Sequence, residues 1–391
     1  MKKNKFAAII IAAGFSSRMD GFKPLLKFGN ETAVEKVVNT HLQAGTDEII
    51  LVVGHRAEEI SPYFKQSSVK LVVNENFEAG MYTSIIKGIN QLSETAAAFF
   101  IHPVDIPLVK APSIDALMSF FEKTEAGILY PCFSGKRGHP PLIDRRYINA
   151  IINNEEDGGL KNLLGKYEAE ALNLPLADQS VLMDMDTQLD YQTLLDYARQ
   201  NAPNPSECEA LLDIFQTPAK IRKHSHKVKE VAMTISKLLT DQGVEIDVAS
   251  LAAAAWLHDI AKTEKNHPEK GALILKNLGY DKIANIILTH MDIDIDLKVN
   301  AKITTEIESN QPIKEREILY LADKLVKDDQ FVQLSIRKAA TQEKFKQQPE
   351  ALAKINKRYQ DAEMIIKKIE KLTGKDFADE QNNLSGPTWR N

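Results

Sequence analysis

The first candidate chemistry lies in a loop after the first apolar run of the chain. The run ends in Ala12-Ala13-Gly14, and Ser16, Arg18 and Lys23 follow. Small residues at the end of a strand let backbone N–H groups approach a phosphate chain, and two cations can neutralise the charge that backbone dipoles leave. The pattern predicts a phosphate site. An ordinary strand-to-helix turn with two solvated cations is the alternative, and the loop alone does not decide between them.

Two carboxylates could add a metal ion to this site. Asp105 ends the buried-strand pattern of residues 96–104, and Asp186 lies in a second acidic cluster, Asp184-Met185-Asp186-Thr187. A carboxylate at the end of a central parallel strand projects into the crevice where the first loop lies, and could hold Mg²⁺ against a triphosphate. Each aspartate could instead cap the helix that follows it.

Polar side chains on apolar helix faces form a second candidate site. His224, His290 and Asp323 each share a face with apolar residues at helical spacing, and a fourth helix leads into the pair His258-Asp259. One such histidine is usually a hydrogen-bonded core residue. An unpaired buried carboxylate costs several kcal/mol, however, and converging imidazoles and carboxylates satisfy each other best around a divalent metal. The set therefore favours a metal site.

The elements that must position these residues divide the chain in two. Short apolar runs alternate with amphipathic segments in the first half. The predicted strands are 6–13, 48–53, 69–73, 96–102 and 127–133, and the predicted helices are 32–43, 82–92 and 114–123. Such alternation predicts a mostly parallel sheet with helices on both faces, with ligands at the carboxyl ends of its strands.

The strand pattern disappears beyond residues 201–207, which contain two prolines and a serine and predict a linker. Helices are predicted at 219–239, 249–262, 268–278, 282–290, 313–327 and 349–372. The expected fold class is therefore an α/β, Rossmann-like domain at 1–200 followed by an all-α domain at 208–343. A C-terminal helix and a polar tail occupy 344–391.

The composition of the chain bears on its partners and on the compartment in which it works. Lys and Arg total 49 and Asp and Glu total 54, for a net charge of −5, which gives no support to nucleic acid or an anionic membrane as a partner. Cys132 and Cys208 form no CxxC pattern and predict reduced thiols. The apolar run 6–13 is too short for a signal peptide, and no stretch reaches transmembrane length. We expect a cytoplasmic protein.

Several motifs occur in order within residues 5–199. They are Ala12-Ala13-Gly14-x-Ser16-x-Arg18-Met19 with Lys23, Asn76-x-x-x-Gly80-Met81-x-x-Ser84, Asp105-x-Pro107, Gly135-x-Arg137-Gly138-His139-Pro140, Asp157-Gly158-Gly159-Leu160 and Asp184-x-Asp186-Thr187. In this order the motifs resemble those of the molybdenum cofactor nucleotidyltransferases. The Ala-Ala-Gly loop and the Gly-His-Pro segment resemble the cytidylyltransferase branch. Asp20 stands where the family most often has Gly.

The resemblance implies transfer of CMP from CTP to molybdopterin, with release of pyrophosphate. It implies nucleotide binding by Ala12, Ala13, Gly14, Ser16, Gly80 and Ser84, catalytic triphosphate binding by Arg18 and Lys23, Mg²⁺ binding by Asp105 and Asp186, and acceptor binding by Arg137 and His139. A molybdenum hydroxylase that receives the finished cofactor is a further expected partner.

The order His224, His258-Asp259, Asp323 in the second half resembles the HD phosphohydrolase superfamily. Lys262 also matches, and His267 and His290 match the extra histidines of the bimetallic subset. The resemblance implies metal-assisted hydrolysis of a phosphoester by one or two divalent ions, with Mn, Fe, Zn or Ni as candidates, and Lys262 as a catalytic phosphate ligand. His267 could instead be the N-cap residue before Pro268.

Alternatives remain open for both halves. The first domain could transfer a nucleotide to a sugar or polyol phosphate, or transfer GMP in place of CMP. A non-catalytic protein that delivers the cofactor to the hydroxylase is the non-enzyme alternative. For the second domain the alternative is a regulatory module that senses nucleotides.

Overall fold

The computed structural model describes residues 4–16, 19, 21–154, 158–293 and 312–379. The chain divides into two compact units, Met1–Arg199 and Gln200–Asn391. Each unit is described by itself below.

A mostly parallel sheet forms the centre of the N-terminal unit, in the strand order β10-β7-β9-β6-β1-β4-β5, with β8 paired to β7. The strands are β1 (Lys5–Ala12), β4 (Glu48–Val53), β5 (Lys70–Val73), β6 (Ala96–Pro103), β7 (Ile128–Phe133), β8 (Lys136–Arg137), β9 (Leu142–Asp144) and β10 (Ala171–Pro175); β2 (Lys27–Phe28) and β3 (Glu31–Thr32) form a separate hairpin. β1 pairs in parallel with β4 and with β6, whereas β9 runs antiparallel between β6 and β7.

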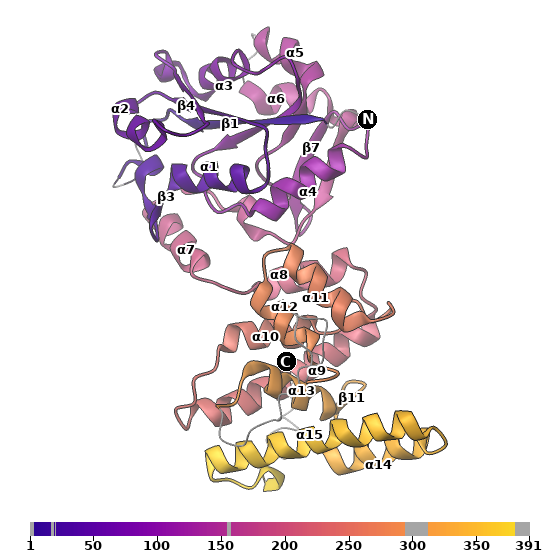
Figure 1. Cartoon of the computed structure of the whole chain (residues 1–391). Helices are drawn as coiled ribbons and strands as arrows, with labels where there is room; N and C mark the ends of the chain where they lie inside the picture. Colours follow the sequence, from indigo (N-terminus) through magenta and orange to yellow (C-terminus); the bar gives the residue numbers. More distant parts are fainter. Residues whose placement is uncertain (1–3, 17–18, 20, 155–157, 294–311, 380–391) are drawn as a thin grey trace. The chain divides into compact units, whose positions relative to one another are not determined.

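Helices cover both faces of this sheet. They are α1 (Ala33–Gln43), α2 (Ala57–Ile60), α3 (Met81–Ile89), α4 (Ala111–Phe121), α5 (Ile148–Ile152), α6 (Gly159–Gly165) and α7 (Gln188–Ala198). In Figure 1, α3, α5 and α6 lie above the sheet and α1 and α4 lie below it. β1 alternates its side chains accordingly: Ile9 and Ile11 belong to one core cluster, and Ile10 and Ala12 to the other.

Local signals explain where two of these helices begin. Thr32 caps α1 and Thr187 caps α7, each in a reciprocal capping box with the residue three positions on. Because Thr187 is the N-cap of α7, Asp186 does not hold that position. Helix α4 begins after Lys110, so Asp105 does not cap a helix either.

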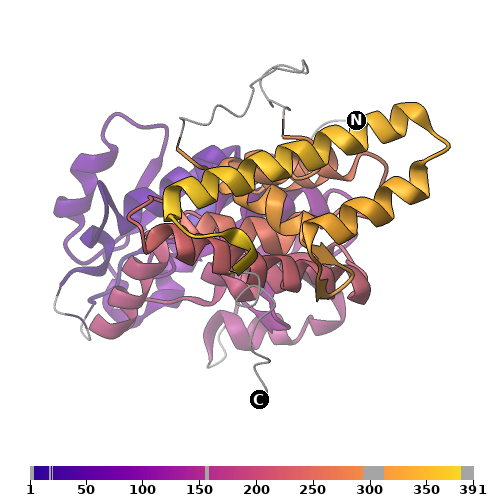
Figure 2. The same ribbon diagram turned by 90° about the horizontal axis from the view of Figure 1, so that it is seen from below.

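The described residues of the C-terminal unit form helices, connecting turns and one short hairpin. Its helices are α8 (Pro205–Ile214), α9 (Ala219–Thr240), α10 (Val248–Leu257), α11 (His267–Asn277), α12 (Asp281–Leu288), α13 (Glu315–Lys324), α14 (Leu334–Phe345) and α15 (Pro349–Thr373); β11 (Val326–Lys327) and β12 (Gln330–Phe331) form the hairpin. Helix α14 lies beside part of the longer helix α15 (Figures 1 and 2). A buried ion pair of 2.8 Å between Lys368 and Glu317 joins α15 to α13.

Several details of this unit differ from the sequence prediction; among them, α14 lies in none of the predicted helices, and β11 occupies the end of the predicted helix 313–327. Helix α8 begins at Pro205, inside the predicted linker 201–207, because Asn204 and Glu207 form a capping box there. Helix α10 ends at Leu257, so the pair His258-Asp259 lies in the turns that follow it, which are closed by Ile260 N–H to the Leu257 carbonyl and Lys262 N–H to the Asp259 carbonyl. Helix α12 ends at Leu288, which places His290 just beyond it.

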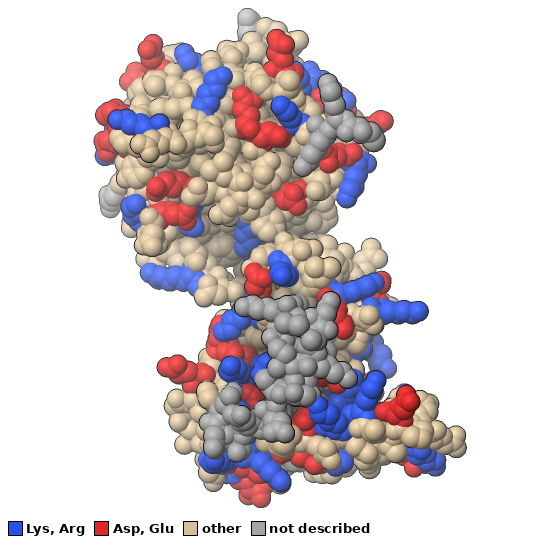
Figure 3. Space-filling model, in the orientation of Figure 1, with Lys and Arg blue, Asp and Glu red and all other residues tan. Residues whose placement is uncertain are grey.

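Acidic and basic side chains are interspersed on the face of each unit drawn in Figure 3. Among the residues that the structure describes, no helix is both long enough and apolar enough to span a membrane.

Candidate functional site

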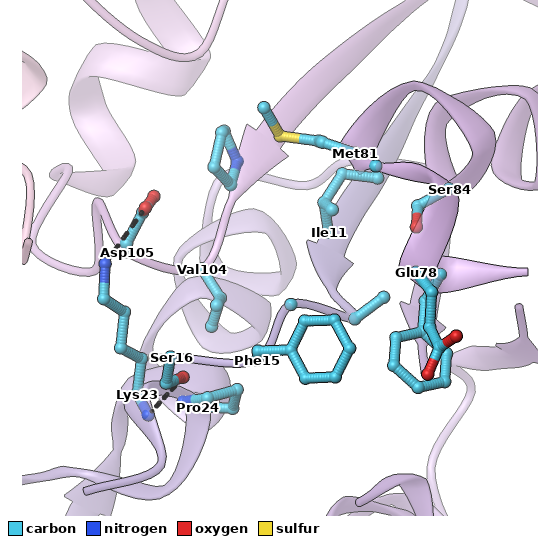
Figure 4. A pocket seen from close by; sticks show the side chains of 15 residues that line it. Ile11, Phe15, Ser16, Lys23, Pro24, Glu78, Met81, Ser84, Val104 and Asp105 are labelled. Carbon is cyan, nitrogen blue, oxygen red and sulfur yellow. Dashed lines mark hydrogen bonds and ion pairs between the residues drawn. The ribbon is translucent and has the colours of Figure 1, made fainter. Parts of the chain in front are cut away.

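The loop after β1 opens onto a cleft of about 320 Å³ in the N-terminal unit. Its walls include Ala13 and Gly14 from the loop, together with Ser16 (Figure 4). Ser16 has a left-handed backbone, with φ of 59°, and its hydroxyl accepts a hydrogen bond of 3.0 Å from the backbone N–H of Lys23. The two ends of the loop are thereby tied together. Ala12 is the buried last residue of β1, and Arg18 lies outside the described residues.

Lys23, Asp105 and Asp186 converge at one side of this cleft. The Lys23 ammonium lies 2.8 Å from Asp186 Oδ1 and 3.7 Å from Asp105 Oδ2 (Figure 4 shows the second contact). Burial raises the pKa of Asp105, and Asp186 and Asp184 act in the same direction, while Lys23 opposes the shift. Two carboxylates therefore already share one cation at this position, which fits a site for Mg²⁺ beside a triphosphate.

Backbone bonds hold both carboxylates at the carboxyl ends of the central strands. The turn after β6 is tied to β1 by the Val104 N–H, which donates to the Ile11 carbonyl at 3.0 Å. The Asp105 carbonyl accepts a hydrogen bond of 2.8 Å from the N–H of Met185, the residue before Asp186. Segments about 80 positions apart in sequence thus present their side chains together.

The opposite wall of the cleft comes from the start of α3. Gly80 precedes α3 with φ of 103°, a left-handed backbone that favours glycine. Ser84 is buried on α3 and its hydroxyl accepts a hydrogen bond of 2.9 Å from Asn74. Both residues line the cleft, as the assignment to the nucleotide site requires.

A second pocket of about 750 Å³ adjoins the cleft and shares Met81 and Pro103 with it. Arg137 and His139 both line this pocket. The Arg137 guanidinium makes two hydrogen bonds to Glu168, of 2.6 and 2.8 Å, and lies 4.4 Å above the Tyr130 ring. Arg137 is therefore already paired, and an anionic ligand must compete with Glu168 for it.

The C-terminal unit brings four of the predicted residues to one buried point. His224 Nε2 lies 3.1 Å from Asp323 Oδ1, and His258 Nε2 lies 3.5 Å from Asp259 Oδ2 and 3.9 Å from Asp323 Oδ1. His258 and Asp259 are at most 1% exposed. Possible ligand atoms of His224, His258 and Asp259 lie within 4.8 Å of one another, the spacing that one metal ion requires.

A second group shares Asp259 with the first. Asp259 Oδ1 lies 3.3 Å from His267 Nε2 and 3.4 Å from His290 Nε2, and these residues also meet the spacing for a metal ion. The Lys262 ammonium lies 3.1 Å from Asp259 and 3.3 Å from His267. His267 is the first residue of α11, and Asn266 precedes it as the N-cap, so His267 does not cap the helix.

The protonation of the histidines tests whether a cation fits here. His224, His258 and His290 each direct Nδ1 at a main-chain carbonyl, of Asp328, Ala255 and Ile287 respectively, at 2.6 to 2.8 Å. A carbonyl can only accept, so each Nδ1 carries a proton; in the neutral ring each Nε2 then turns a lone pair towards a carboxylate or another imidazole, and a second proton or a metal ion at Nε2 removes that repulsion. A buried lone pair facing a carboxylate is unfavourable unless a cation lies between them, and His258 Nε2 has no hydrogen-bond partner within the described chain.

The pKa shifts agree with this electrostatic pattern. Burial acts to raise the pKa of Asp259, but His258, His267 and His290 hold it below its ordinary value. Burial acts to lower the pKa of His224, and Asp323 outweighs that effect and raises it. The donor set of imidazoles and carboxylates suits a divalent transition metal.

Comparison with known proteins shows what these two arrangements belong to. Residues 8–171 match the family described as "MobA-like NTP transferase domain", and residues 221–328 match the family described as "HD domain". The chain joins a MobA-like NTP transferase domain to an HD domain. This confirms the fold class and the family resemblance expected for each half, and both domains indicate an enzyme.

Curated relatives match the MobA-like domain. Molybdenum cofactor cytidylyltransferase of Escherichia coli (strain K12) is 26% identical over 186 residues, which are 47% of this chain and 93% of the relative. Nicotine blue oxidoreductase of Paenarthrobacter nicotinovorans is 25% identical, over 46% of this chain and 91% of the relative. Bifunctional protein GlmU of Staphylococcus carnosus (strain TM300) is 25% identical, over 41% of this chain and 34% of the relative. The crystal structure of Rv0371c from Mycobacterium tuberculosis H37Rv is 24% identical, covers 50% of this chain and 100% of its own, and has a TM-score of 0.45.

The sequence missed two residues that support the metal-ligand candidates of the HD domain. Lys324 is buried, and its ammonium donates 3.0 Å to the His290 carbonyl and lies 3.7 Å from Asp323. Arg337, on α14, donates to the main-chain carbonyl of Asp323. Lys324 thus links the two ligand groups. In the sequence, Lys324 is marked only by its position directly after Asp323. Helical periodicity alone does not predict that the Lys324 side chain is buried.

Proposed function

We propose that the MobA-like domain transfers CMP from CTP to a molybdopterin-type cofactor and releases pyrophosphate. The observation that carries this proposal is the convergence of Lys23, Asp105 and Asp186 beside the small-residue loop that ends β1. Phosphate-binding backbone, a cation and two carboxylates are what a metal-bound triphosphate needs. The relative named as a molybdenum cofactor cytidylyltransferase, covered over 93% of its length, supports this choice of substrates.

In this reaction an oxygen of the acceptor's terminal phosphate attacks the α-phosphorus of CTP. A new P–O–P bridge forms, the bond from the α-phosphorus to the bridging oxygen of the β-phosphate breaks, and its electron pair leaves with pyrophosphate. A terminal phosphate is already ionised near neutral pH, so the protein has mainly to align the phosphates and stabilise charge.

The residues divide this task between them. The backbone of Ala12–Gly14 and the side chains of Ser16 and Arg18 would surround the triphosphate, with Gly80 and Ser84 on the opposite wall. Lys23 would exchange its carboxylate partners for phosphate oxygens. Asp105 and Asp186 would hold Mg²⁺, which when bound neutralises charge on the phosphate oxygens.

The adjoining pocket of about 750 Å³ would take the acceptor. A volume in this range accommodates a ligand of drug size. Arg137 and His139 would contact the acceptor, and its phosphate would displace Glu168 from Arg137. The shared wall at Met81 and Pro103 would bring the acceptor's phosphate towards the α-phosphorus.

A pyrophosphate-release screen tests this proposal. Purified full-length protein is assayed with CTP, GTP or UTP against molybdopterin, sugar phosphates and polyol phosphates, alongside the variants Asp105→Asn and Asp115→Asn. We expect release from CTP with molybdopterin only, loss of release in Asp105→Asn, and normal release in Asp115→Asn, because Asp115 is exposed on α4 away from the cleft.

Other outcomes of the screen would contradict the proposal in distinct ways. Release from GTP would identify a guanylyltransferase, and release with a sugar or polyol phosphate would identify a different acceptor. Bound cofactor without pyrophosphate release would favour a protein that delivers cofactor to a molybdenum hydroxylase.

We propose further that the HD domain hydrolyses a phosphoester with the help of two divalent metal ions. His224, His258, Asp259 and Asp323 would hold one ion, and Asp259, His267 and His290 would hold the second. The observation that carries this proposal is Asp259, which lies in both ligand groups. Metal ions in such a site supply a hydroxide nucleophile near neutral pH.

The HD domain's own residues hold and orient the ligands. The main-chain carbonyls of Asp328, Ala255 and Ile287 fix three imidazoles with Nε2 directed inward. Lys262 lies at the edge of the second group, with 36% of its side chain exposed, and would bind the substrate's phosphate.

Reconstitution with metals tests the HD proposal. Protein stripped of metal is loaded with Mn²⁺, Fe²⁺, Zn²⁺ or Ni²⁺ and assayed with p-nitrophenyl phosphate and with nucleotides, in wild type, Asp259→Asn and Asp281→Asn. We expect metal-dependent hydrolysis that Asp259→Asn abolishes and that Asp281→Asn, an exposed change on α12, preserves. Ligand binding without hydrolysis in any metal form would favour a nucleotide-sensing module.

A further inference from the structure

Two fully buried histidines lie in the core of the MobA-like domain, and neither is among the residues assigned above to phosphate or metal. His41 is on α1 and His102 is on β6, and each is 0% exposed. His41 Nε2 lies 3.0 Å from His102 Nδ1. Buried polar groups are costly unless they are hydrogen bonded, so their partners indicate why they are there.

The two rings form one directed chain of hydrogen bonds. His102 Nε2 lies 3.0 Å from the Ile106 carbonyl, which can only accept, so His102 Nε2 carries the proton. His102 Nδ1 must then accept from His41 Nε2–H. His41 Nδ1, 3.2 Å from the Thr46 hydroxyl, accepts in turn from that hydroxyl. Each ring is neutral, and its tautomer is fixed by the carbonyl at one end of the chain.

The carbonyl at that end belongs to the turn that carries Asp105. The Ile106 N–H closes the turn by donating to the Pro103 carbonyl at 3.2 Å. The N–H of Val104 bonds to β1 and the carbonyl of Asp105 accepts from Met185. The hydrogen bond from His102 Nε2 to the Ile106 carbonyl holds the end of the turn. The bond between His41 and His102 fixes the orientation of the His102 ring.

We propose that His41 and His102 are positioning residues for nucleotidyl transfer, which hold the Pro103–Ile106 turn so that Asp105 points at the metal. This inference rests on the function proposed for the MobA-like domain. It assigns a role to two residues that touch neither nucleotide nor acceptor.

The variants His102→Gln and His102→Leu separate this role from simple packing. Glutamine places an amide N–H near the position of His102 Nε2 and can keep the bond to the Ile106 carbonyl, whereas leucine fills similar space without a donor. The control Leu117→Ala removes a fully buried side chain on α4 and lowers stability while leaving the donors and acceptors of this hydrogen-bond chain in place.

Two readouts on the full chain test the proposal. The first is hydrogen exchange of the backbone amides of residues 104–106, and the second is the Mg²⁺ concentration that gives half-maximal pyrophosphate release. For His102→Leu we expect faster exchange in this segment and about a tenfold higher Mg²⁺ requirement, in the range seen when partners of metal ligands are removed. His102→Gln should restore both values to near wild type.

The outcomes distinguish this inference from the proposed function. If wild type releases no pyrophosphate, the proposed function fails, and exchange at 104–106 still tests the link from His102 to the turn. If His102→Leu and Leu117→Ala behave alike in both readouts, the inference is wrong. If His102→Leu does not fold, His41→Leu provides the same comparison, because His102 then loses the donor that fixes its ring, and unchanged exchange would overturn the proposal.

Discussion

Lowering the pH should destabilise the MobA-like domain through its buried histidine pair. Burial lowers the pKa of His102 to about 4 from an ordinary value of 6.5, and lowers that of His41 well below its ordinary value, with the neighbouring ring adding to the shift. At pH values between the folded and the unfolded pKa, the imidazoles of the unfolded chain bind protons that those of the folded chain do not. The free energy of unfolding therefore falls as the pH falls below the unfolded pKa.

The size of this effect follows from the pKa shift of His102. At about pH 5 the imidazole of His102 is protonated in the unfolded chain and neutral in the folded chain. This pH lies roughly 1.5 units below the unfolded pKa, and each unit lowers the free energy of unfolding by about 1.4 kcal/mol. His102 alone should thus lower the free energy of unfolding by about 2 kcal/mol between about pH 7.5 and about pH 5. Protonation of His41 in the unfolded chain adds to the loss.

Urea unfolding at the two pH values measures this loss. The chain's two tryptophans, Trp256 and Trp389, both follow the MobA-like domain. Fluorescence therefore follows the C-terminal unit, and far-UV circular dichroism adds the N-terminal transition. The variant His102→Gln removes one titrating group, so its N-terminal transition should lose about 2 kcal/mol less than wild type does. Equal losses in wild type and variant would refute the reasoning.

Three further perturbations have defined outcomes. Lys23→Ala should lower kcat/KM for CTP by roughly 10- to 150-fold, because a hydrogen bond to a charged group contributes about 1.5–3 kcal/mol; steady-state pyrophosphate release measures this, and an unchanged value would remove Lys23 from the site. Lys368→Met should destabilise the C-terminal unit by about 3–5 kcal/mol, since it leaves the buried Glu317 carboxylate without its cation. Urea unfolding followed by tryptophan fluorescence measures this loss, and an unchanged unfolding midpoint would contradict it. Chelation of metals should lower the melting temperature of the C-terminal unit and leave that of the N-terminal unit unchanged, because a metal that binds only the folded state stabilises it. Calorimetry measures both transitions, and an unchanged C-terminal melting temperature would argue against a bound ion.

The sequence was sufficient for those parts of the fold that local patterns encode. Alternating apolar runs predicted β1, β4, β5, β6 and β7 to within a residue or two of their observed bounds. Parallel order then implied that Asp105, at the end of a central strand, would face the loop after β1. Helical periodicity likewise predicted that His224 and Asp323 would face a common core.

Local sequence patterns did not predict very short strands or contacts between residues that are far apart in the sequence. Strand β9 has three residues, too few to show alternation, and it is stabilised by antiparallel pairing with β6 and β7. The bond between His41 and His102 joins residues 61 positions apart, and neither residue's neighbours indicate the other. The burial of Lys324 depends on packing that helical periodicity does not encode.

The positions of candidate ligands were predicted better than their surroundings. The sequence brought out His258 and Asp259 as a pair, but placed them within a helix, whereas they lie in the turns after α10. Those turns matter, because the bond from His258 Nδ1 to the Ala255 carbonyl directs Nε2 inward. Only the structure shows that Asp259 belongs to both groups.

Metal content per chain tests the account of the HD domain most directly. Wild type, His267→Ala, Asp259→Ala and Asp281→Asn are loaded with Mn²⁺, passed through gel filtration in nucleotide-free buffer and analysed by mass spectrometry for bound metal. Because Asp259 serves both groups and His267 serves one, we predict about two ions in wild type and in Asp281→Asn, about one in His267→Ala and almost none in Asp259→Ala. Asp259→Ala that retains as much metal as wild type would contradict the shared site.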